Sequence, residues 1–124
     1  MARLFTLEEA NLVVSTIRPL IAQIMDIRRV VLEKRPEIWA FLVKIASNGG
    51  NKMASQADND FLKLQSLIHK IIDTGAEIKD IDTGLVDFHS IRDGQEVLLC
   101  WKYNEEEIQY WHYLDAGFAG RQKI

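Results

Sequence analysis

Apolar residues recur at three- and four-residue steps from position 10 to position 31, which is the spacing of one buried helical stripe. Thr6 and Glu9 precede this stripe with the spacing of a capping box, so we expect the helix to begin there. Pro19 removes one amide donor inside it. Because the stripe keeps its phase we expect a kink, and two separate helices are the alternative. The stripe comprises Ala10, Val13, Val14, Ile17, Leu20, Ile21, Ile24, Ile27 and Val31.

Two further helices are predicted before Gly75. Pro36 suits the first turn of a short helix, whose apolar stripe comprises Ile38, Phe41, Leu42 and Ile45. Residues 48–51, Asn-Gly-Gly-Asn, are expected to form a turn. The third helix is expected from about Ser55 to Thr74, with Gly75 as its C-terminal stop. Its inward residues are expected to be Phe61, Leu64, Leu67, Ile68 and Ile71.

The pattern changes after Gly75 from helical to extended. Glu77–Ile81 reads as a short strand, Gly84–Ile91 as a second, and Gln95–Lys102 as a nearly continuous apolar strand. Asp93-Gly94 is the preferred centre of a two-residue type I′ turn, which predicts a hairpin between the last two strands.

A two-residue turn fixes the register of this hairpin. Asp87 then faces Cys100, and alternation sorts the side chains onto two faces. One face is apolar and should pack on the helices, whereas the other is mixed. The apolar face comprises Val86, Phe88, Val97, Leu99 and Trp101, and the mixed face comprises Asp87, His89, Ile91, Leu98 and Cys100.

A last short helix is predicted after Tyr103, with Asn104 as its cap and three glutamates in its first turn. Helical spacing would place Ile108, Trp111, His112 and Asp115 on roughly one side. The tail over residues 116–121 is glycine-rich, and Phe118 is a candidate anchor for it.

The length of 124 residues suits one domain, with a helical part over 1–75 and the hairpin, short helix and tail over 76–124. The predicted fold class is α+β, mostly helical, with three main helices packed on a small antiparallel hairpin or sheet. The net charge of −3 and the lack of a basic stripe argue against nucleic acid as a partner. No membrane span is expected, and a single cysteine fits a reducing, cytoplasmic location.

The stretch from Lys79 to Arg121 contains the only cysteine, two of the three histidines and two of the three tryptophans, so we look there for a binding or catalytic site. Cys100 with His89 or His112 suggests an activated nucleophile, and a buried, inert thiol is the competing interpretation. His112 with Asp115 is either an oriented base or a helix-end pair. Arg121 binds an anion or pairs with Asp80, Asp82 or Asp87. The candidate binding residues are Asp87, Cys100, Trp101, Trp111, His112, Asp115 and Arg121.

Neither a metal nor a cofactor is predicted. His69 lies beside the stripe of the third helix and has no His or Cys at the spacing of a helical metal site. The acidic set Asp80, Asp82 and Asp87 lacks the alternating ligands of an EF-hand loop.

Four short motifs, GLVDF, LCW, YWH and GF-GR, together with FTLEEAN near the start, carry a resemblance to a known family. The chain resembles an uncharacterised bacterial and archaeal family, the domain of unknown function numbered twenty-two-oh-three, over Phe5–Asn11 and Lys79–Gln122. The resemblance implies a small, mostly helical cytoplasmic protein with no established activity. His89 and Lys123 stand where proline is usual in that family, which weakens His89 as a shared catalytic group.

Two functions remain open. The first is a non-enzymatic binding or protein-interaction module, with a homodimer as one form, because the apolar helical stripes are long for the core of so small a chain. The alternative is a small-molecule or anion pocket, with or without catalysis, built from the Lys79–Arg121 region. The absence of a complete catalytic constellation favours the first.

Overall fold

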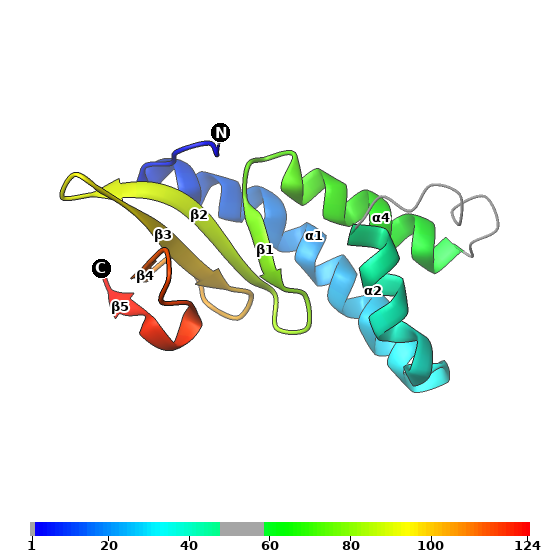
Figure 1. The fold of residues 1–124 in the computed structure, drawn as a ribbon. Coiled ribbons are helices and arrows are strands. Elements are labelled where there is room, and N and C mark those ends of the chain that lie inside the picture. Colours follow the sequence, from blue (N-terminus) through cyan, green and yellow to red (C-terminus); the bar gives the residue numbers. More distant parts are fainter. Residues whose placement is uncertain (1, 48–58) are drawn as a thin grey trace.

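The described residues form three α-helices and a five-stranded antiparallel sheet (Figure 1). The structure is a computed structural model and describes residues 2–47 and 59–124. The predicted turn at 48–51 and the predicted start of the third helix near Ser55 lie outside the described residues. The α+β class is confirmed, although the sheet is larger than the predicted hairpin.

The first helix, α1 (Leu7–Lys34), begins with the predicted capping box. Thr6 N donates to Glu9 Oε1 over 2.8 Å, and Glu9 N donates to Thr6 Oγ1 over 3.1 Å. Pro19 lies inside one continuous helix, so the alternative of two helices is wrong. The buried residues of α1 follow the predicted stripe; they are Ala10, Val14, Ile17, Ile21, Ile24, Ile27 and Val31.

A 3-10 turn, Pro36–Ile38, leads into α2 (Trp39–Ser47). The predicted stripe is confirmed for Leu42, which is buried, and for Ile38 and Ile45, which pack partly buried against the core, but not for Phe41, which is 53% exposed. The prediction also omitted Trp39 and Ala46, which are buried. The helix α4 (Asn59–Ile72) buries Phe61, Leu64, Leu67, Ile68 and Ile71, as predicted.

The sheet is an antiparallel meander in which each strand pairs with the next along the chain. Its strands are β1 (Glu77–Asp80), β2 (Leu85–Arg92), β3 (Gln95–Lys102), β4 (Tyr110–Tyr113) and β5 (Gln122–Lys123). Asp93 and Gly94 join β2 to β3 with φ values of 53° and 78°, as a type I′ turn requires. The predicted register is confirmed, and Asp87 pairs with Cys100.

The predicted last helix is wrong. Residues 104–107 form turns, and residues 110–113 form β4, which pairs with β3. Two tyrosines and a tryptophan in Tyr-Trp-His-Tyr favour an extended chain, and β3 offers an edge for them to pair with. The tail that follows contains a second 3-10 turn, Phe118–Gly120, before β5. Phe118, the candidate anchor of the tail, is 47% exposed.

One face of the sheet packs on α1, which crosses behind it, while α2 and α4 lie beyond β1 (Figure 1). Val86, Phe88 and Trp101 are fully buried in the same core as the α1 stripe. The N-terminal segment joins the sheet beyond the end of β1, since Phe5 N donates to His89 O over 2.7 Å. Ser90 Oγ donates back to Phe5 O over 2.6 Å.

Gly84 should be far less tolerant of a side chain than Gly94. Both have positive φ, so alanine costs about 1–2 kcal/mol of backbone strain at either position. A Cβ on Gly84 would lie 2.6 Å from Tyr103 Cβ and 3.2 Å from an Ile21 methyl, whereas one on Gly94 meets nothing within 4 Å. Overpacking should add about 1–3 kcal/mol to Gly84→Ala alone. Urea unfolding of both variants measures the difference, and equal losses would contradict the prediction.

Candidate functional site

Three polar side chains meet on the face of the sheet that points away from α1. Asp87 on β2 pairs with Cys100 on β3, and His112 on β4 pairs with Leu98. Alternation therefore places Asp87, Cys100 and His112 on one face of three neighbouring strands. Their residues are 2%, 0% and 2% exposed. We call this set the buried polar cluster.

The orientation of His112 is fixed by two contacts. Its Nδ1 lies 2.8 Å from the carbonyl oxygen of Tyr113, and a carbonyl only accepts, so Nδ1 carries a proton and donates. Its Nε2 lies 3.2 Å from Asp87 Oδ2. In a neutral ring this Nε2 holds a lone pair, and the carboxylate oxygen it faces holds others. The contact therefore requires a proton or another cation between the two atoms.

Burial dominates the electrostatics of this cluster. It raises the pKa of the Asp87 carboxyl, although nearby His112 opposes the change. Burial, followed by the charge of Asp87, raises the pKa of the Cys100 thiol to about 12. The thiol is therefore protonated at neutral pH, as the interpretation of an inert cysteine expects. Asp87 Oδ1 is buried and accepts no hydrogen bond from a nitrogen or oxygen of the described residues, although the Cys100 thiol is close enough to hydrogen-bond the carboxylate.

Arg121 joins the cluster from the C-terminal segment. Its Nη2 donates to Glu105 Oε1 over 2.6 Å and to the Cys100 carbonyl oxygen over 3.1 Å. The guanidinium lies 4.1 Å from the ring centre of Tyr110 and 4.8 Å from that of Phe118. Arg121 thus holds the tail against β3 and β4. Its partner is Glu105, instead of the predicted Asp80, Asp82 or Asp87.

The sequence analysis missed Glu105 because it assigned the three glutamates to a helix start. Glu105 Oε1 also accepts from Lys102 N over 2.8 Å, and its backbone nitrogen donates to Lys102 O. The side chain therefore closes the turn after β3 while it binds Arg121. A glutamate three positions after the end of a predicted strand was the available signal.

The two tryptophans of the predicted site, Trp101 and Trp111, lie on the opposite face of the sheet from the buried polar cluster. Trp101 neighbours Cys100 on β3, and Trp111 neighbours His112 on β4, so alternation directs both toward the helical side. Trp101 Nε1 donates to the backbone oxygen of Glu105. Asp115 is exposed in the segment after β4. The structure thus brings together Asp87, Cys100, His112 and Arg121 from the predicted set, and separates Trp101, Trp111 and Asp115 from them.

His89 forms a second, more accessible polar group on the same face. Its Nδ1 lies 2.9 Å from Glu96 Oε2, and its Nε2 lies 3.1 Å from Glu77 Oε2. Hydrogen bonds to Glu77 and Glu96 raise the pKa of His89 above 6.5, although partial burial opposes this. His89 therefore pairs with carboxylates instead of with Cys100.

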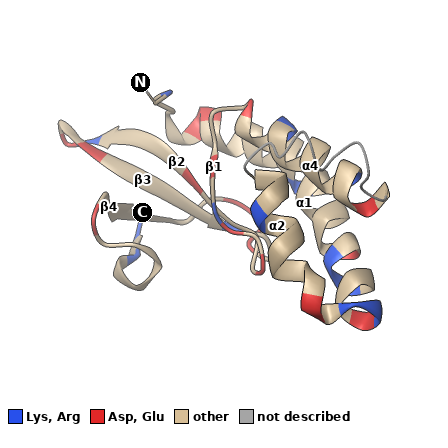
Figure 2. Cartoon of the chain, turned by 45° about the vertical axis from the view of Figure 1, so that its right-hand side comes forward, with Lys and Arg blue, Asp and Glu red and all other residues tan. Residues whose placement is uncertain are grey.

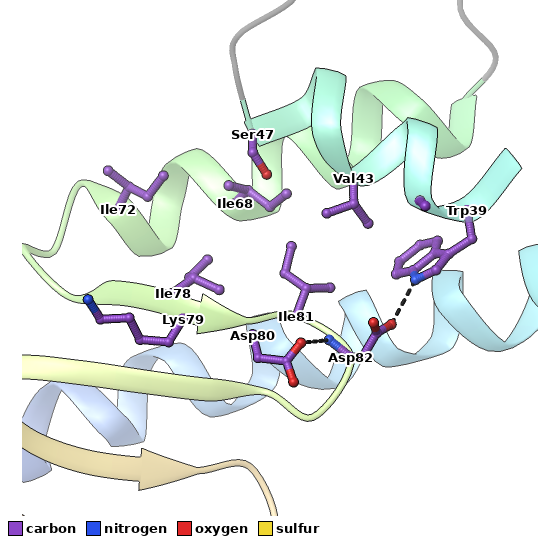
Figure 3. Close-up of a pocket in the computed structure, with 11 residues that line it drawn as sticks. Trp39, Val43, Ser47, Ile68, Ile72, Ile78, Lys79, Asp80, Ile81 and Asp82 are labelled. Atoms are coloured by element: carbon purple, nitrogen blue, oxygen red, sulfur yellow. Dashed lines mark hydrogen bonds between the residues drawn. The ribbon is translucent and has the colours of Figure 1, made fainter. Parts of the chain in front are cut away.

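The concavities elsewhere on the described part of the molecule include two grooves with largely apolar linings. The first, of about 410 Å³, lies between β1, α2 and α4 (Figure 3). Its apolar lining comprises Trp39, Val43, Ile68, Ile72, Ile78 and Ile81. Asp82 lies at its rim, where Oδ1 accepts from Trp39 Nε1 and from Arg28 Nε, each over 2.8 Å.

The second groove, of about 380 Å³, lies between the N-terminal segment and the hairpin end of the sheet. Leu99 and Phe5 are buried beneath it, and Glu9 and Arg92 contribute opposite charges to its lining. Four large hydrophobic side chains lining it are exposed; they are Leu4, Leu7, Ile91 and Ile124. We call this the apolar groove.

The family model described as "Uncharacterized conserved protein (DUF2203)" matches residues 3–124. The chain belongs to the DUF2203 family. This confirms the resemblance that the sequence motifs indicated. No curated protein and no solved structure matches the chain. No described helix of this DUF2203 member is long and apolar enough to cross a membrane.

Replacing Asp82 tests how much its hydrogen bonds to Arg28 and Trp39 stabilise the contact between the β1–β2 turn and the helices. Asp82→Ala leaves the N–H of the buried Trp39 without its acceptor and should cost roughly 1–3 kcal/mol. Asp82→Asn keeps an acceptor and should cost less.

Arg28 and Trp39 hold the pKa of Asp82 below 3.8, so its charge stabilises the fold above that pH. The gap between wild type and Asp82→Asn should therefore close as pH falls through the lowered pKa. Chemical unfolding over a pH series measures it, and a gap independent of pH would contradict the prediction.

A double-mutant cycle tests how strongly Arg121 and Glu105 hold the tail. Their side chains are only 12% and 18% exposed, so Arg121→Met and Glu105→Gln should show a coupling of roughly 1–3 kcal/mol. The exposed pair Arg29 and Glu33 is the matched control, with an expected coupling of about 0.3–0.5 kcal/mol. Equal couplings for both pairs would show that Arg121 does not pin the tail.

Proposed function

We propose that this DUF2203 member is a non-enzymatic protein-interaction module that associates with a second copy of itself through the apolar groove. The observation that carries the proposal is the gathering of Leu4, Leu7, Ile91 and Ile124 around one concavity. Exposed apolar side chains are ordinary singly, but a contiguous group marks an interaction surface. The group comes from both ends of the described chain and from β2, so only the folded protein assembles it.

A second copy fits the groove because its charges are mixed. Glu9 and Arg92 provide one acid and one base, so two copies related by a two-fold axis can face each other without like charges meeting. Over the described residues, acidic and basic positions are interspersed instead of forming one basic face (Figure 2). This distribution suits a protein partner better than nucleic acid.

The long apolar stripe of α1 does not need a second copy to cover it. The apolar stripe of α1 is covered by the sheet and by α4 within the same chain, so its length does not call for a partner. The apolar surface that supports self-association is therefore the apolar groove, and not the stripe of α1.

The chemistry of the buried polar cluster supports a binding role over catalysis. The Cys100 thiol is fully buried and, with its raised pKa, protonated at neutral pH, so it is a poor nucleophile. Arg121, the candidate anion ligand, is already bound to Glu105. The alternative of a small-molecule or anion pocket in the Lys79–Arg121 region therefore requires Arg121 to exchange partners.

Self-association should be concentration-dependent and sensitive to a charge in the apolar groove. Ile91→Glu replaces one of the four exposed apolar side chains with a carboxylate and should shift the protein to monomer. Leu62→Glu, at a residue of similar exposure on α4, is the matched control and should still associate. Analytical ultracentrifugation over a concentration series measures all three proteins. A wild type that stays monomeric at high concentration would overturn the proposal, as would equal weakening in both variants.

A further inference from the structure

We propose that Asp87, Cys100 and His112 form a binding site for a divalent transition-metal ion of the zinc class. This inference is independent of self-association, because the buried polar cluster lies on the face of the sheet away from α1 and shares no lining residue with the apolar groove.

The donor atoms are already gathered. One ligand atom from each residue, a carboxylate oxygen, the sulfur and a ring nitrogen, lies within 4.8 Å of the other two. The distance from His112 Nε2 to Asp87 Oδ2 is 3.2 Å. Zinc bonds of 2.0–2.2 Å at a tetrahedral angle would place nitrogen and oxygen ligands about 3.4 Å apart. The observed pair is therefore close to the separation that a shared ion demands.

His112 is held as metal-binding histidines are held. Its Nδ1 donates to the Tyr113 carbonyl, which leaves the Nε2 lone pair directed at the cluster. A backbone carbonyl on the far ring nitrogen is a common partner of zinc-ligating histidine, because it fixes both the tautomer and the ring orientation. A cation between Nε2 and Asp87 Oδ2 would satisfy both atoms at once.

Asp87 supplies an independent sign of a ligand. Its side chain is 3% exposed, and Oδ1 accepts no hydrogen bond from a nitrogen or oxygen of the described residues, which leaves this carboxylate with the weak thiol donor of Cys100 beside His112. A buried carboxylate oxygen without a donor is costly, so native proteins seldom keep one without a compensating role. A metal ion offers coordination in place of the missing donor.

The charges of the loaded site would balance. One thiolate and one carboxylate contribute two negative charges, a divalent ion contributes two positive charges, and the histidine is neutral. A neutral sum suits a buried site, whereas an isolated charge there is heavily penalised. The metal would also replace the thiol proton, since a coordinated cysteine is deprotonated. The mixed nitrogen, sulfur and oxygen donor set matches the ligands that zinc accepts.

The strands hold these donors firmly. Asp87, Cys100 and His112 come from three adjacent paired strands, with neighbouring registers fixed by the β2–β3 and β3–β4 ladders. Sites built on paired strands are positioned more precisely than sites on loops. Three protein ligands leave a fourth zinc position, the arrangement of sites that keep a place for water or another small ligand.

Titration of the full-length protein with Co²⁺, under reducing conditions, tests the site. Cobalt in the zinc position should give the intense visible bands of tetrahedral coordination and a near-ultraviolet thiolate charge-transfer band, and Zn²⁺ should abolish both. Cys100→Ala should lose the charge-transfer band. Asp87→Asn, His112→Gln and Cys100→Ala should each weaken Zn²⁺ binding by at least about 100-fold, because even outer partners of metal ligands are worth about 10- to 100-fold.

His89→Gln is the matched control, since His89 with Glu77 and Glu96 is the rival place for a cation on the same face. This variant should bind Zn²⁺ like wild type. Asp87→Asn guards against loss of folding, because asparagine is nearly isosteric and can donate to His112 Nε2. Circular dichroism of each metal-free variant verifies its fold.

Two results would overturn the proposal. One is a wild-type protein that shows no thiolate band with Co²⁺. The other is Zn²⁺ binding that disappears in His89→Gln and survives in folded Asp87→Asn. This second result would assign the metal to His89 instead.

Discussion

The two-residue turn at Asp93–Gly94 is the constraint on which the rest of the structure depends. A type I′ turn joins β2 to β3 without a spare residue, so it fixes which side chains share a face. A shift of one residue would direct Asp87 toward the α1 stripe and Val86 toward the polar side. The same geometry therefore builds the hydrophobic core on one side of the sheet and the buried polar cluster on the other.

Local signals allowed much of this arrangement to be predicted from the sequence. The capping box at Thr6, the α1 stripe and the Asp93–Gly94 turn each depend on residues close together in the chain, and all three are confirmed. The pairing of Asp87 with Cys100 followed directly from the turn. The sequence alone therefore placed two of the three residues of the buried polar cluster opposite each other.

The segment after β3 could not be predicted in the same way. Glu105–Glu107 after Asn104 is typical of a helix start, yet Glu105 closes a turn and binds Arg121, which lies 16 positions further along the chain. Such a long-range partner leaves no periodic mark in the sequence. The following Tyr-Trp-His-Tyr run is too short to separate a helical period from a strand period, and pairing with β3 decides it. His112 lies beside Asp87 only because β4 pairs with β3, and the sequence did not reveal this pairing.

The contact between Phe5 and Ser90 joins the N-terminal segment to the hairpin end of β2, 85 positions further along the chain. The β2–β3 hairpin connects neighbouring residues and can form within microseconds, whereas the closure of so long a loop carries a larger entropic cost. The N-terminal segment also occupies the part of β2 that the short β1 leaves unpaired. During synthesis α1 emerges first, but Phe5, which precedes it, can dock only after β2 has been made. The chain therefore depends on its second half to complete the docking of its first residues.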